Sequence, residues 1–159
     1  MNLSFRLKRF FFNAFREIFI HHHSSLEFRA KLFALVLSAK DKATVNDYII
    51  VRKIAMDIYE NDEERANLLM VSTKEIRKKI EDDNKDVSEI LIHSIQKQLK
   101  IVPRYATKIE IEKLKDLLAE FNDKDTISYQ ENILEFLQTI KEETMLNKRS
   151  LHSINNKNI

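Results

Sequence analysis

Acidic side chains gather at two corners of this sequence, and carboxylates at that spacing could bind a hard cation. The first corner carries Asp41 and Asp47, and the second carries Asp123, Asp125 and Glu131. Divalent cations need several oxygen ligands that converge on one point. If the fold brings the corners together, the five acids form one acidic neighbourhood. That neighbourhood is a candidate site for calcium, magnesium, manganese or zinc.

The second corner does not fit a calcium loop of the EF-hand type. Counting back from Glu131 as the last ligand places Lys124 at an inner ligand position, and an ammonium group cannot ligate a cation. Asp125 falls at the turn position where such a loop needs glycine. Lys42 and Lys124 also place two positive charges at the corners, which oppose cation binding.

The same acids have a second interpretation, as helix caps and turns. A small polar residue followed three positions later by an acid is a capping pattern, and it recurs along the chain. Asp47 and Glu131 would then stabilise helix N-termini, and Asp41 and Asp123 would make turns. The sequence leaves both interpretations open. The capping pairs are Ser24 and Glu27, Thr44 and Asp47, Asn61 and Glu64, Asp86 and Glu89, Thr107 and Glu110, and Ser128 and Glu131.

The capping pairs mark the starts of helices, so the two acidic corners lie between helices of an all-α fold. The 159 residues are 43% hydrophobic, which suffices for one core, and the absence of glycine disfavours the tight turns of all-β folds. We expect a compact bundle of about six helices from two related helical hairpins, plus an amphipathic N-terminal helix. The spans are 25–40, 45–59, 62–82, 87–101, 107–121 and 128–146.

Four shorter patterns refine this expectation. Residues 32–37, LFALVL, are apolar nearly all round, which predicts that helix 25–40 runs through the core. Pro103 ends the fourth helix, because the residue before a proline is pushed out of helical geometry. Residues 75–86 alternate bases and acids, which indicates a solvated, salt-linked face. Residues 147–159 have little to bury and are expected to fray.

Composition also excludes whole classes of function. The chain has no cysteine, so disulfides, thiolate metal sites and cysteine nucleophiles are absent. Without glycine, it cannot form a phosphate-binding loop, a dinucleotide fingerprint or a nucleophile elbow. The net charge of +2 is not that of a nucleic-acid-binding polycation. No arrangement of residues indicates catalysis, so we expect no enzyme, no cofactor beyond a divalent cation and no nucleic-acid partner.

Residues 1–20 are the second candidate for function, because their pattern is that of an amphipathic helix. Phenylalanine rings could enter the acyl region of a membrane while guanidinium groups contact anionic headgroups. The same apolar face could instead pack on the domain itself or on a second subunit. The apolar side chains are Leu3, Phe5, Leu7, Phe10, Phe11, Phe12, Phe15, Ile18 and Phe19, with Arg6, Arg9 and Arg16 among the residues opposite.

The two corners are similar in order, since residues 41–45 are Asp-Lys-Ala-Thr-Val and residues 123–127 are Asp-Lys-Asp-Thr-Ile. In AKDKATVND and FNDKDTISYQE this order resembles the repeat of the TerB-like family. That family includes the tellurite-resistance TerB proteins and a domain of membrane-tethered DnaJ-type co-chaperones. The likeness covers residues 27–141. Lys42 and Lys124 stand where the family has glycine, an extra residue separates each Asp from the hydrophobic position, and Ile49 stands near the place of the first Glu.

The resemblance implies a helical bundle with clustered acids of the kind proposed to bind divalent cations. The positions that match the family motif are Asp41, Asp123 and Glu131, with Asp47 and Asp125 as neighbours. It also implies a role in stress response or tellurite resistance.

Together these patterns predict an N-terminal helix at 1–23, a TerB-like domain at 24–146 and a flexible basic tail at 147–159. The expected function is non-enzymatic binding of a partner protein or an anionic membrane surface. The expected location is the cytoplasm or the inner face of the membrane. One alternative is a structural subunit that oligomerises through the N-terminal helix, and another is a metal-dependent hydrolase that uses the acids.

Overall fold

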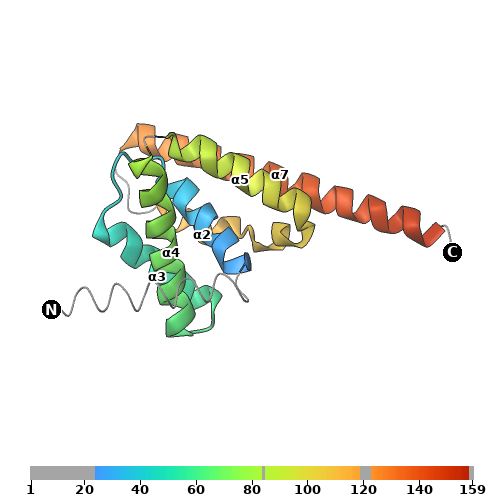
Figure 1. The fold of residues 1–159 in the computed structure, drawn as a ribbon, viewed down its shortest axis with the longest axis horizontal. Helices are drawn as coiled ribbons and strands as arrows, with labels where there is room; N and C mark the ends of the chain where they lie inside the picture. Colours follow the sequence, from blue (N-terminus) through green and yellow to red (C-terminus); the bar gives the residue numbers. More distant parts are fainter. Residues whose placement is uncertain (1–23, 84, 119–122, 158–159) are drawn as a thin grey trace.

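The computed structural model describes residues 24–83, 85–118 and 123–157, and this part of the chain is helical without β-strands. The all-α prediction is therefore confirmed. The helices form a bundle from which one long C-terminal helix projects (Figure 1). In chain order the elements are α2 (Ser24–Leu37), α3 (Val45–Ile58), α4 (Glu63–Asp82), α5 (Val87–Ile101), the 3-10 helix η1 (Pro103–Lys108), α6 (Ile111–Lys115) and α7 (Lys124–Lys157).

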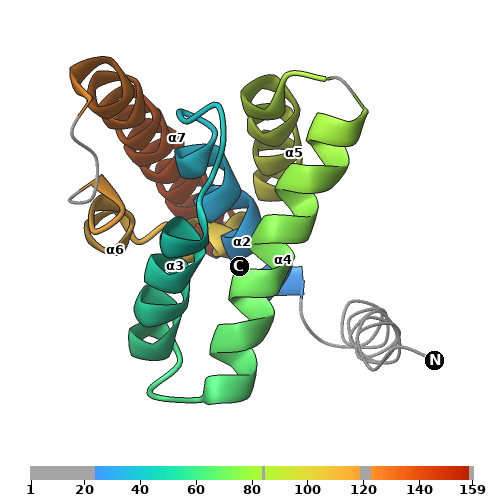
Figure 2. The same cartoon turned by 90° about the vertical axis from the view of Figure 1, so that its left-hand side faces the viewer.

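Helix α2 lies at the centre of the bundle. It contacts α4, α5, α7 and η1, while α3 packs against α4 (Figure 2). All six residues of the LFALVL run are buried, because every face of this helix meets another element. The prediction of a helix that runs through the core is confirmed, and burial of apolar surface on this scale is the main stabilising contribution to such a fold.

Capping chemistry sets the helix starts in the first half of the chain. Thr44 and Asp47 form the expected capping box at the start of α3, and the Asp86 side chain accepts a hydrogen bond from the Glu89 N–H. At α4 the cap is Asp62 rather than Asn61. Asn61 instead has a φ of 67°, in the left-handed region that asparagine tolerates, and it helps to reverse the chain between α3 and α4.

The segment between α5 and α7 differs from the prediction. The helix expected at 107–121 is replaced by η1 and the five-residue α6. The Thr107 hydroxyl bonds back to the Arg104 carbonyl instead of capping a following helix. Pro103 does end α5 as expected, and it opens η1.

Helix α7 is longer than predicted in both directions. It begins at Lys124 because the Asp123 carboxylate accepts a hydrogen bond from the Thr126 N–H, so a cap lies ahead of Ser128. It continues to Lys157 because no glycine or proline interrupts the sequence after Leu146. Residues 147–157, which we expected to fray, therefore belong to this helix, and a flexible tail at 147–159 stays a prediction.

Candidate functional site

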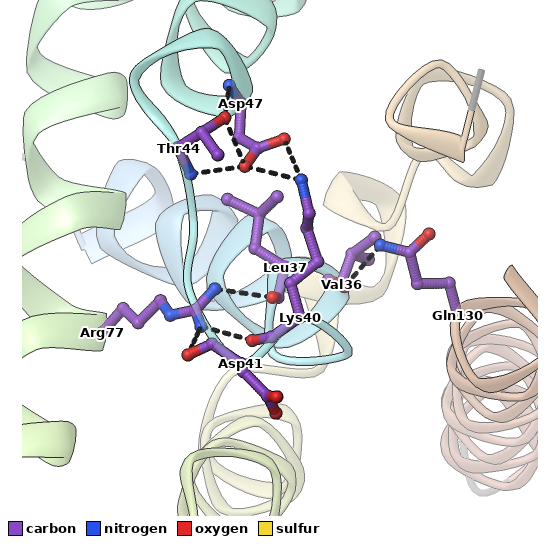
Figure 3. A network of polar contacts seen from close by, with 8 residues as sticks. All are labelled: Val36, Leu37, Lys40, Asp41, Thr44, Asp47, Arg77 and Gln130. Atoms are coloured by element: carbon purple, nitrogen blue, oxygen red, sulfur yellow. Dashed lines mark hydrogen bonds and ion pairs between the residues drawn. The ribbon is translucent and has the colours of Figure 1, made fainter. Parts of the chain in front are cut away.

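A network of buried polar groups surrounds the C-terminal end of α2. The Arg77 side chain of α4 is 3% exposed, and its guanidinium donates to the carbonyl oxygens of Leu37 at 2.6 Å, Lys40 at 2.5 Å and Asp41 at 3.2 Å (Figure 3). Its Nε also donates to Glu81 at 2.6 Å. The last carbonyls of a helix have no partner within the helix, so this guanidinium serves as their cap.

The burial of Arg77 corrects the interpretation of residues 75–86 as a solvated face. Most of that segment is exposed or half-buried, but Arg77 lies inside it as a buried cap. The position has a sequence signal. Arg77 follows Thr73 by four residues and precedes Ile80 by three, so it continues the apolar stripe of α4.

Among the five acids of the predicted cation site, Asp47 is buried, with 2% of its surface exposed. Its carboxylate accepts hydrogen bonds from Lys40 Nζ at 2.9 and 3.0 Å and from the Thr44 N–H at 2.6 Å (Figure 3). Burial raises the pKa of Asp47, but the hydrogen bonds from Thr44 and Lys40 together lower it more. The pKa therefore lies below its ordinary value of 3.8, and this carboxylate is ionised and already paired.

Helix α7 reaches the same end of the bundle. Gln130 is fully buried and donates from Nε2 to the Val36 carbonyl at 3.1 Å (Figure 3). The Ser88 hydroxyl shares one hydrogen bond with Ser38 at 2.9 Å and accepts another from Tyr129 at 3.0 Å. The end of α2 and the starts of α5 and α7 therefore meet at one end of the molecule.

The remaining predicted acids are spread over this surface. Asp41 is exposed, and its carboxylate points away from that of Asp47 (Figure 3). Asp123 is exposed and caps α7, accepting hydrogen bonds from the Thr126 N–H and hydroxyl, which lower its pKa. Asp125 is exposed in the first turn of α7, and Glu131 is exposed beside the apolar groove between α6 and α7.

Among the residues that the structure describes, no three His, Cys, Asp or Glu side chains come together as a group that could hold a metal ion. The geometry gives Asp47 the capping role of the second interpretation, and Asp123, which that interpretation placed in a turn, also caps a helix. The capping acid in α7 is Asp123 rather than Glu131. The cation site that the resemblance implies stays a prediction.

A groove that the sequence did not reveal lies between α5, the start of η1 and the distal half of α7. It has a volume of about 480 Å³, and Leu99, Pro103, Ile140 and Leu151 supply its apolar lining. Sequence reasoning missed it because one of its walls belongs to residues that were expected to fray.

The predicted membrane or partner face falls outside the described residues, since it belongs to residues 1–23. Within the part of the chain that is described, no helix has the length and apolar character needed to cross a membrane.

Comparison of the chain with protein-family models, curated proteins and solved structures found no match. The resemblance to TerB-like proteins therefore stays a prediction.

Replacing Arg77 by Met should lower the free energy of unfolding by about 3 kcal/mol, because the carbonyls of Leu37, Lys40 and Asp41 would lose a charged donor. Arg65→Met is the matched control on the same helix. Arg65 is largely exposed, and within the described residues its side chain forms an ion pair with Asp62 alone, so its loss should cost about 0.5 kcal/mol or less. Urea denaturation measures both values, and equal losses would contradict the capping role.

Because the pKa of Asp47 is lowered in the folded protein, the free energy of unfolding should depend on pH. The ionised carboxylate stabilises the fold fully above the unfolded-state pKa of about 3.8, and this contribution disappears as the pH falls through the lower folded-state pKa. Asp47→Asn should therefore be less stable at neutral pH and lose less stability between pH 5 and 2. Thermal unfolding measures this, with Asp41→Asn as the exposed control. Parallel curves for wild type and Asp47→Asn would contradict the argument.

Asp123→Ala should lower the thermal midpoint, because α7 would lose its N-terminal cap. The same melts with and without added calcium, magnesium, manganese or zinc test the cation hypothesis. A midpoint that rises with a metal in the wild type but not in Asp123→Ala or Asp41→Ala would support a shared ion. A metal-independent midpoint in all three would leave capping as the role of Asp123.

Proposed function

We propose that the protein is a non-enzymatic binding module that attaches to an anionic membrane surface through residues 1–20. The observation that carries this proposal is the sequence of that segment, where six phenylalanines and three leucine or isoleucine side chains share one wide face and Arg6, Arg9 and Arg16 lie among the residues opposite. A helix with such faces places rings below the headgroups and cations against them.

The energetics favour attachment by a segment of this kind. Fully burying one phenylalanine side chain contributes roughly 1.5 to 3 kcal/mol, and each cation near an anionic surface adds about 1 kcal/mol. Several rings and cations therefore exceed the binding that a single lipid chain provides. The basic charge belongs to this segment, because residues 1–23 carry four Lys and Arg against one acid, whereas residues 24–159 carry 23 Lys and Arg against 24 Asp and Glu.

The proposed role of the helical domain is to present a binding surface next to the membrane. Its first helix begins at Ser24, directly after the amphipathic segment and its His21–His23 triplet. Attachment would hold the domain within a few residues of the headgroups. A contribution to stress response or tellurite resistance rests on the family resemblance and would act through this same attachment.

A structural subunit that assembles through residues 1–20 is the alternative, because a second copy could cover the phenylalanine face as well as lipid does. Light scattering separates the two. A dimer that dissociates when the segment is removed would favour the alternative.

Full-length protein should co-sediment with phosphatidylcholine vesicles that contain roughly one quarter phosphatidylglycerol, and added salt should weaken this binding. A chain that starts at Ser24 should stay in the supernatant. Phe11→Asp should weaken binding about tenfold or more, because a carboxylate would enter the apolar face. Asn13→Asp, on the polar side, is the control for the added charge. Equal recovery of the full and shortened chains in the supernatant would refute the proposal.

A further inference from the structure

The groove between α5, η1 and α7 has an apolar base and one exposed apolar wall. Helix α7 continues past the ends of α5 and η1, so its distal half forms a wall that stands away from the bundle (Figure 1). Leu99 and Ile140 are buried at the base, while Leu151 on the projecting wall is 63% exposed. Large exposed apolar side chains beside a concave apolar surface are typical of a docking site.

Each wall of the groove carries one lysine, Lys100 on α5 and Lys148 on α7. Lys100 lies in a stretch from residue 90 to residue 109 that has no acid, and Lys148 lies in the run without acids after Glu143. Among the described lining residues Glu143 is the one carboxylate. Within the described chain no ion pair joins Lys97, Lys100, Arg104 or Lys148 to an acid. Because the net charge is only +2, this basicity is a local feature.

The charge and the shape of the groove disfavour several possible ligands. Residues 1–20 of this chain carry Arg6, Lys8, Arg9 and Arg16 against one acid, so the groove would repel them. The distal α7 of a second copy is basic as well. A planar bilayer cannot follow a concave floor. The described lining residues include no Phe, Tyr or Trp, so they lack the stacking platforms that single-stranded nucleic acids use.

We propose that this groove binds an acidic amphipathic helix of a partner protein. The apolar stripe of that helix packs on Leu99, Ile140 and Leu151, and its carboxylates face Lys100 and Lys148. This is the helix-in-groove mode, in which anchors at helical spacing supply affinity and the charged rim supplies orientation and partner choice. The site is separate from the proposed membrane segment, and it can operate whether or not that segment binds lipid.

The test uses full-length protein and a fluorescent peptide of about 18 residues, or five helical turns, with leucine at i, i+3, i+4 and i+7 and glutamate elsewhere. A second peptide has lysine in place of each glutamate. Fluorescence anisotropy should show binding of the glutamate peptide that weakens with salt, and no comparable binding of the lysine peptide.

The chain offers matched control variants. Leu151→Asp and Lys148→Glu alter the lining and should each weaken binding about tenfold. Leu146→Asp and Arg149→Glu make the same changes on exposed positions of the same helix that do not line the groove. These should stay within about threefold of wild type. All four positions are exposed, so circular dichroism should show an unchanged fold.

Several outcomes would overturn the proposal. One is a glutamate peptide that fails to bind below about 1 mM, and another is equal binding of both peptides. Equal effects of the lining and control variants would also exclude the groove. If Leu151→Asp instead abolishes sedimentation with phosphatidylglycerol vesicles, or dissociates a dimer in light scattering, the surface serves lipid or a second copy.

Discussion

One buried guanidinium holds this fold together at the point where its central helix ends. The last six residues of α2 are apolar and buried, so the final carbonyl of this helix, that of Leu37, lies inside the protein rather than in water. A chain without glycine lacks the residue that most often closes a helix in the left-handed region, and the last turn of α2 has no basic side chain. Arg77 donates from α4 to that carbonyl and to the carbonyl of Lys40. The two helices are thereby fixed in register as well as packed together.

The same cap organises the rest of that end. With the carbonyl of Lys40 bound to Arg77, the Lys40 side chain is directed to Asp47, where it pairs with the carboxylate that starts α3. Gln130 of α7 binds the next free carbonyl, that of Val36. Helices α3, α4 and α7 thus meet around the end of α2 through hydrogen bonds to buried and half-buried groups. A buried polar group without a partner destabilises a fold by more than a typical hydrogen bond stabilises it.

The features that sequence reasoning recovered are those fixed by local chemistry. The Thr44 and Asp47 capping box, the stop at Pro103 and the buried run 32–37 each depend on residues within one or two turns. The features that it missed depend on distant partners. Nothing near Arg77 shows that a helix end forty residues earlier needs a donor, and a charged run normally indicates solvent. The five acids were grouped by a likeness between two corners, but capping, a local need, determines the position of Asp47 and Asp123.

The distal half of α7 is exposed, whereas α2 is largely buried. This difference in burial bears on where a partner could bind. Isolated helical segments of about 12 to 15 residues are marginal in water, and most helical stability in proteins comes from packing of an apolar face. Beyond Met145 every described side chain of α7 is exposed, Leu146, Leu151 and Ile154 included. This half is therefore helical through continuity with the packed half and the absence of helix breakers. A partner helix in the groove would cover Leu151 and supply the packing that these turns lack, so partner binding and the stability of distal α7 are thermodynamically linked.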